Sequence, residues 1–80
     1  MKLPYIDMIA TGENINNLRK DCGLSIKSMQ IELGFSTPNA IYKWIHGYSL
    51  PTIDNLVILS KMLNVSIDSI VIVGDRNGNV

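Results

Sequence analysis

Apolar residues recur at helical spacing in five segments of the chain, and this pattern predicts five helices. The two central segments have the clearest boundaries. Ser25 is a suitable N-cap for the first of them, and Gly34 can adopt the left-handed conformation that ends it. Thr37 is the expected N-cap of the second, Pro38 follows at the first helical position, and Gly47 ends it. Two short helices joined by a tight turn predict a helix-turn-helix unit.

Three further helices are predicted around this unit. Thr11 is the expected N-cap of a helix that ends at Gly23. Thr52 is the expected N-cap of a longer helix that ends at Asn64, and Ser66 starts a short fifth helix. The predicted fold is therefore all-α, a compact domain of five helices. The expected organisation has three parts: an N-terminal leader at 1–10, the helix-turn-helix domain at 11–73 and a flexible C-terminal tail at 74–80.

The same periodicity predicts which side chains are buried. Trp44 should be largely buried in the second central helix, and Phe35 in the turn before it should face the core. Cys22 is expected to be a small core residue near the end of the first helix. In the helix after Thr52, the residues that fit the buried side are Ile53, Leu56, Leu59, Ser60 and Leu63.

The composition is that of a single soluble domain. The chain has 80 residues, of which 46% are apolar, and this suffices for a core without disulfides or metal. Its longest apolar runs are four residues, far short of a membrane span, and its start does not resemble a signal peptide. The single cysteine excludes an internal disulfide and suits a reducing compartment. We therefore expect a cytoplasmic protein that does not contact a membrane.

The net charge of zero argues mildly against nucleic-acid binding, so the local placement of charges matters more than their sum. Three predicted helices carry an acid in the first turn, Glu13, Asp54 and Asp68, which suits the positive end of the helix dipole. The two central helices carry Lys27 and Asn39 there instead. A helix start without an acid is available to an outside anion such as a DNA phosphate, although many helix starts lack an acid by chance.

An ordered set of short motifs extends over roughly residues 12–71. The motifs are Gly12-x-x-Ile15-x-x-Leu18-Arg19, Gly23-Leu24-Ser25, Leu33-Gly34-Phe35-Ser36, Ile41-x-x-Trp44-x-x-Gly47, Leu50-Pro51 and Leu56…Leu63-x-Val65-Ser66. In this order and spacing they resemble the Cro/repressor helix-turn-helix family, also called XRE-type regulators. The resemblance implies a lambda-repressor-like bundle of five helices whose third helix lies in the DNA major groove. The sequence departs from the family pattern at Ile26, Gln30 and Ile45, and the turn before the third helix is one residue longer than usual.

The resemblance also implies which residues contact DNA. The candidates for reading bases are polar or small residues early in the third helix or on its outer face: Thr37, Asn39, Ala40, Tyr42, Lys43 and His46. At the start of the second helix, Ser25, Lys27 and Ser28 are candidates for phosphate contacts, and Lys43 suits either role. The alternative is that these residues form an ordinary solvated helix face.

The sequence shows no catalytic, metal or cofactor chemistry. His46 is the only histidine and has no cysteine near it in the sequence, so a metal site is not expected. The seven carboxylates are scattered, without a paired spacing that suggests acid–base catalysis. We therefore expect a protein that is not an enzyme and needs no cofactor.

Four apolar residues fall outside the expected core, and exposed apolar patches usually mark an interface. Ile58 and Met62 lie off the buried face of the fourth helix, and Ile72 and Val73 follow the fifth. Together they predict a homodimer that binds a two-fold-related site on double-stranded DNA. The alternative is that Tyr5 and Ile6 of the leader cover this patch.

A second function from another class fits the same fold. A protein-interaction module, such as an antitoxin-like partner or an adaptor, would not bind DNA. The zero net charge and the isoleucines at positions 26, 31 and 45 favour it, whereas the two helix starts without acids, together with Lys27 and Lys43, favour DNA. A positive surface over those two helix starts would support DNA binding, and a neutral apolar one would support the interaction module.

Overall fold

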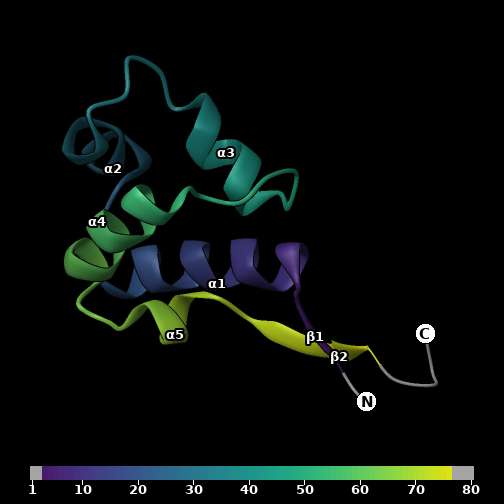
Figure 1. Cartoon of the computed structure of the whole chain (residues 1–80). Coiled ribbons are helices and arrows are strands. Elements are labelled where there is room, and N and C mark those ends of the chain that lie inside the picture. Colours follow the sequence, from purple (N-terminus) through teal and green to yellow (C-terminus); the bar gives the residue numbers. More distant parts are fainter. Residues whose placement is uncertain (1–2, 77–80) are drawn as a thin grey trace.

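The computed structural model of the chain describes residues 3–76 and has five helices and two short strands. In Figure 1, α1 runs across the molecule, α2, α3 and α4 lie above it, and α5 lies below it and leads into β2, which pairs with β1. The elements are β1 (Leu3–Ile6), α1 (Met8–Asp21), α2 (Ile26–Leu33), α3 (Asn39–Ile45), α4 (Ile53–Leu63), α5 (Ile67–Ile70) and β2 (Val73–Arg76). The five predicted helices are therefore present.

Ser25 and Ser66 cap their helices as predicted, whereas Thr52 stands at the start of α4 but makes no side-chain cap hydrogen bond. The Ser25 hydroxyl accepts a hydrogen bond from the Ser28 N–H at 2.9 Å, and Gly34 ends α2 with a φ of 73°. The predicted start of α3 is one residue too early: Pro38 is the N-cap and not the first helical residue, and α3 begins at Asn39, whose N–H donates to the Thr37 hydroxyl at 3.4 Å. Asn64 ends α4 in the left-handed conformation, with a φ of 56°.

The predicted start of α1 at Thr11 is wrong. The helix begins three residues earlier, at Met8, where the Asp7 carboxylate accepts from the Ala10 N–H at 3.0 Å. Thr11 lies inside the helix and is buried, and its hydroxyl accepts from the Ile72 N–H at 2.9 Å. Because the helix starts earlier, Glu13 is not in its first turn, and Asp7 is the acid at this positive helix end.

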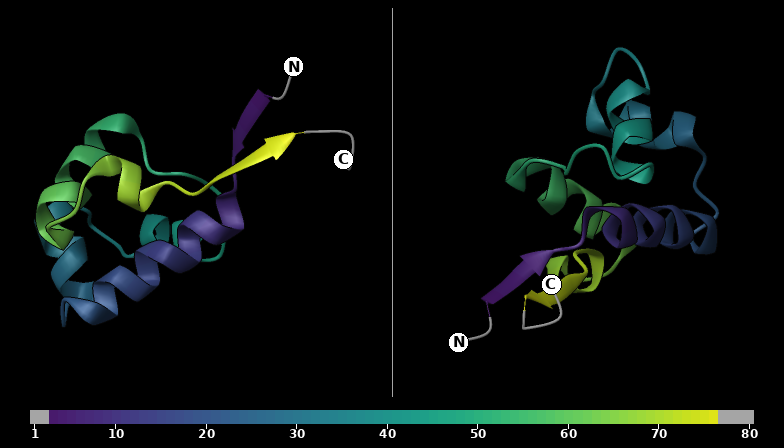
Figure 2. Two further views of the ribbon diagram at one scale, coloured as in Figure 1. Left: turned by 90° about the horizontal axis from the view of Figure 1, so that it is seen from below. Right: turned by 90° about the vertical axis from the view of Figure 1, so that its right-hand side faces the viewer.

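A two-stranded antiparallel sheet corrects the expectation of an all-α fold. β1 pairs with β2 from Leu3 opposite Arg76 to Ile6 opposite Val73. The expected leader is thus a strand followed by the first turn of α1, and the first three residues of the expected tail belong to β2. Residues 1–2 of the leader and 77–80 of the tail lie outside the described part of the chain. Both strands extend away from the helices (Figure 2).

The core lies between the helices. Ile15, Met29, Ile41, Leu59 and Ile70 are fully buried, and they are joined by the nearly buried Leu33, Trp44 and Leu63. Phe35 packs against this cluster with its ring edge-on to Trp44, the two centroids 5.8 Å apart, as the sequence predicts.

Two expected core residues are exposed. Ile53 is the first residue of α4 and is 77% exposed, because contact of α4 with the core begins one turn later, at Leu56. Cys22 follows the last residue of α1 and is also exposed, because the chain leaves the core there.

Candidate nucleic-acid interface

The position of α3 is fixed by the burial of one of its sides. Ile41 and Trp44 are buried in the core and Ile45 is half-buried against it. Asn39 and Lys43 lie four residues apart on the opposite side, which is exposed. Tyr42 and His46 form a second exposed row with the same spacing, so four of the predicted DNA-binding residues share one outer face: Asn39, Tyr42, Lys43 and His46.

Two shallow hollows flank the start of α3. The first, of about 460 Å³, lies between α3, the turn before it and the loop after it, and is lined by Phe35, Ser36, Thr37, Asn39, Ala40, Lys43 and Ser49. The second, of about 430 Å³, lies between the starts of α2 and α3, and is lined by Ile26, Lys27, Gln30, Ser36, Thr37, Pro38 and Tyr42. The structure therefore brings Lys27 of α2 to the same surface as the exposed face of α3.

The charged side chains that line this surface are both basic. Each hollow contains one lysine, Lys43 in the first and Lys27 in the second, and no residue lining either hollow is acidic. The first turns of α2 and α3 also lack acids, whereas α4 and α5 carry Asp54 and Asp68 there. Although the whole chain is neutral, the surface over these two helix starts is therefore suited to an anion.

Ser25 and Ser28 lie next to Lys27 but do not line the hollows. Their hydroxyl oxygens are 2.9 Å apart, and the Ser25 oxygen also accepts from the Ser28 N–H. The two side chains thus hold the first turn of α2, and Ser25 remains exposed beside the lysine.

His46 is part of a row of aromatic side chains at the end of α3. Its ring stacks on Tyr42 with the centroids 6.4 Å apart and the planes 16° apart, and it lies 6.1 Å from the ring of Tyr48. The sequence analysis missed Tyr48 as a member of this surface, together with Ser36 and Ser49. Only their positions in the turns before and after α3 could have indicated them, because residues in such turns lie close to the exposed face of the helix.

Two of the three isoleucines that favoured a protein-interaction module are partly buried and so offer little surface to a partner. Ile26 and Ile45 pack partly against the core, and only Ile31 on α2 is largely exposed. The surface over the two helix starts thus carries two lysines and no acid, beside the partly exposed Ile26 and the exposed Tyr42. By the criterion set from the sequence, this favours DNA over a protein partner.

Among residues 3–76, no helix is long and apolar enough to cross a membrane, and no group of three histidine, cysteine, aspartate or glutamate side chains is placed to hold a metal ion.

Comparison with known proteins agrees with this geometry. A family model described as helix-turn-helix matches residues 15–70, which confirms the resemblance to XRE-type regulators. Two solved structures have a similar fold. The restriction-modification controller protein C.AhdI from Aeromonas hydrophila superposes with a TM-score of 0.71 at 19% identity, over 80% of this chain and 96% of that one. The DNA-binding domain of BldD superposes with a TM-score of 0.68 at 15% identity, over 82% of this chain and 94% of that one. No curated protein matches the sequence significantly.

Proposed function

The chain belongs to the helix-turn-helix family, and we propose that it is a sequence-specific DNA-binding transcription regulator that inserts α3 into the major groove. The observation that carries this proposal is the exposed polar face of α3, flanked by two hollows that hold Lys27 and Lys43 and no acid. One protein of similar fold is a DNA-binding domain and another is a controller protein, which agrees with this role.

The proposed contacts divide into two sets. Asn39 suits a paired contact with adenine at the start of α3, and Lys43, exposed one turn later, suits the acceptors of guanine. Thr37 and Ala40 line the same hollow and suit a thymine methyl group, and Tyr42 and His46 extend this face toward the end of the helix. Lys27, with Ser25 and Ser28, contacts phosphates where α2 crosses the DNA backbone.

The biological role follows from the same arrangement. We propose a cytoplasmic repressor, since repression would follow from occupying a promoter. It acts as a homodimer, whose two α3 helices read half-sites about 34 Å apart. The four apolar residues that the sequence suggested as dimer contacts do not belong to one element: Ile58 and Met62 belong to α4, whereas Val73 begins β2 and Ile72 precedes it.

The test begins with selection of bound sequences from a pool of random duplex DNA. Affinity for the selected site is then measured by fluorescence anisotropy between low and moderate salt. Each phosphate contact should contribute a log–log slope of about −0.9, because binding releases condensed counterions. Lys27→Ala should weaken binding to every sequence and make the slope shallower by about one contact. Lys20→Ala, an exposed lysine on α1, is the matched control and should leave the slope unchanged.

A protein that selects no sequence and binds no duplex at low salt would contradict the proposal. The antitoxin-like or adaptor function would then be favoured.

A further inference from the structure

The apolar residues of α4 extend beyond the side that packs against the core, which includes Leu56 and Met62. Leu59 and Leu63 are buried in the core. On the outer side, Val57 is 47% exposed and Ile58 is 37% exposed. Exposed apolar residues that adjoin one another often mark an interface, so this outer part of α4 has the character of one.

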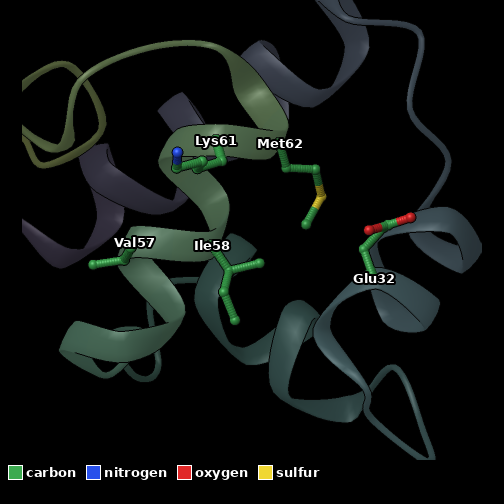
Figure 3. Close-up of a pocket in the computed structure, with 5 residues that line it drawn as sticks. All are labelled: Glu32, Val57, Ile58, Lys61 and Met62. Carbon is green, nitrogen blue, oxygen red and sulfur yellow. The ribbon is translucent and has the colours of Figure 1, made fainter.

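This outer side borders a groove of about 470 Å³, lined by Glu32 of α2 and by Val57, Ile58, Lys61 and Met62 of α4. Figure 3 shows how these side chains are arranged. Ile58 and Met62 point into the space between the two helices. Lys61 lies on one side of this apolar pair, and Glu32 lies on the other, on the facing helix. Across the groove the order is therefore basic, apolar, acidic.

Glu32 and Lys61 form no ion pair within the part of the chain that the structure describes. A basic–apolar–acidic row is complementary to itself when a second copy is turned by 180° about an axis across the row. Lys61 of each copy then meets Glu32 of the other, and the apolar pairs meet in the middle. This is the arrangement of a two-fold interface, in which one surface patch serves both subunits.

We propose that the surface around the groove between α2 and α4 is the dimer interface of this protein. The same surface of a second copy packs against it. The inference rests on the proposed function only for the existence of a dimer, and it assigns the surface that forms it. Ile58 and Met62 are retained from the sequence prediction, whereas Ile72 and Val73 lie outside the interface. The apolar contact supplies affinity, and the two reciprocal charge pairs at its rim fix the orientation of the partners.

The first experiment compares two exposed valines on different surfaces. The molar mass of the full chain is measured by sedimentation equilibrium over a range of concentrations, and circular dichroism checks that each variant is folded. Val57→Asp should convert the dimer to a monomer. Val73→Asp is the matched control, because Val73 is 56% exposed on β2, and this variant should remain a dimer. A parent chain that is monomeric at all concentrations, or the opposite result for the two valines, would overturn the proposal.

The second experiment reverses the rim charges. Glu32→Lys and Lys61→Glu each place like charges opposite one another at both symmetric contacts. We expect each single variant to raise the dimer dissociation constant by about tenfold or more. The double variant Glu32→Lys/Lys61→Glu restores opposite charges and should recover most of the parent affinity. A double variant as weak as the two singles combined would show that these residues do not meet across an interface.

The failure of this proposal can be distinguished from a failure of DNA binding. Val57→Asp leaves the face of α3 unchanged, so the monomer should still bind a single half-site with the salt slope of one parent subunit. Loss of the dimer with retained half-site binding supports both proposals. A dimer that Val57→Asp breaks, in a protein that binds no DNA, supports the interface and contradicts the function.

Discussion

The carbonyl oxygen of Trp44 lies 2.1 Å from the position that a β-carbon on Gly12 would occupy, so only glycine fits at this point of α1. The carbonyl oxygen of Ile45 is 2.8 Å from the same position. The backbone of α1 therefore rests directly on the last turn of α3. Because α3 carries the proposed base contacts on its other side, this contact sets the position of the recognition surface relative to the rest of the domain.

Gly12→Ala should strongly destabilise the fold. The added methyl group would meet backbone atoms, which cannot rotate away, so α1 and α3 must separate. We expect a loss of about 3 kcal/mol or more in the free energy of unfolding, at the upper end of the range for overpacked sites. Urea denaturation measures this. Gly34→Ala is the control: its φ is 73°, but nothing lies within 4 Å of the added carbon, so it should cost only about 1–2 kcal/mol. Equal losses in the two variants would contradict the tight contact.

Trp44→Ala should cost roughly 3–5 kcal/mol, the range for removing a large aromatic side chain from a core. Trp44 is 4% exposed and packs edge-on with Phe35. Tyr48→Ala removes an aromatic side chain that is 77% exposed and should change the free energy of unfolding by less than about 0.5 kcal/mol. A Trp44→Ala protein that melts like the parent would show that the buried side of α3 has been misjudged.

The helix boundaries after residue 22 could be predicted because their signals are local. Ser25, Gly34, Asn64 and Ser66 each act within one turn of their own position, and the structure places them as the sequence indicated. Thr11 shows the limit of this approach. It has the chemistry of an N-cap, but its hydroxyl is bonded to Ile72, 61 positions away in the sequence.

The strands could not be predicted for a related reason. β1 and β2 come from opposite ends of the chain, so no turn sequence connects them, and their pairing depends on contacts such as the Asp7 N–H with the Ile72 carbonyl. All four residues of β1 are exposed, so it lacks the alternation of buried and exposed residues that marks a strand in a sequence.

The exposed face of α3 could be predicted from the sequence, but the residues that α2 and the neighbouring turns add to the site could not. Periodicity alone places Asn39 and Lys43 on the side of α3 opposite Trp44, and the structure agrees. The approach of Lys27 to the same surface depends on how α2 packs against α3, which periodicity does not specify. Ser36 and Ser49 were missed because they lie in turns without a recurring pattern.

Thr11→Val should loosen the strand pair. The Thr11 hydroxyl accepts from the Ile72 N–H, and valine of similar shape leaves that N–H without a partner. A cost of about 1–3 kcal/mol is expected for such a group in a buried setting. The free energy of opening that hydrogen exchange reports for the Ile72 amide should fall by a similar amount. The values for amides in α2 should change less. Unchanged exchange at Ile72 would show that this hydrogen bond does not hold the strands to α1.

The hydrogen bond from the Thr52 hydroxyl holds the pKa of the Asp54 carboxyl below its ordinary value. Because the pKa is lowered in the folded state, the hydrogen bond stabilises the fold above the ordinary carboxyl pKa of about 4, and this contribution is lost as the pH falls through the folded pKa. Thr52→Val should raise the pKa of Asp54 toward its ordinary value, as measured by carboxyl-resolved NMR titration. An unchanged titration of Asp54 would contradict the assigned cause.

Asn39→Ala and Lys43→Ala should separate the proposed role of α3 in DNA recognition from its role in the core. Both side chains are exposed, so neither change should alter the melting temperature appreciably. If the face lies in the major groove, each should cost about 1–3 kcal/mol on the selected site and relax the choice of base at one position. In a dimer the relaxed position should appear in both half-sites, since each subunit presents the same face. The change in preferred sequence is measured by repeating the selection with each variant.

Asn17→Ala and Lys20→Ala are the matched controls, because they remove the same side-chain types from exposed positions on α1. They should change neither the affinity nor the selected sequence. Equal losses on the selected site and on random DNA would make Asn39 and Lys43 phosphate contacts, since such contacts carry no sequence information. An unfolded variant would instead place its residue in the core, against the exposure that the structure shows. Only a loss confined to the selected sequence, with the fold intact, fits a helix that reads bases through this face.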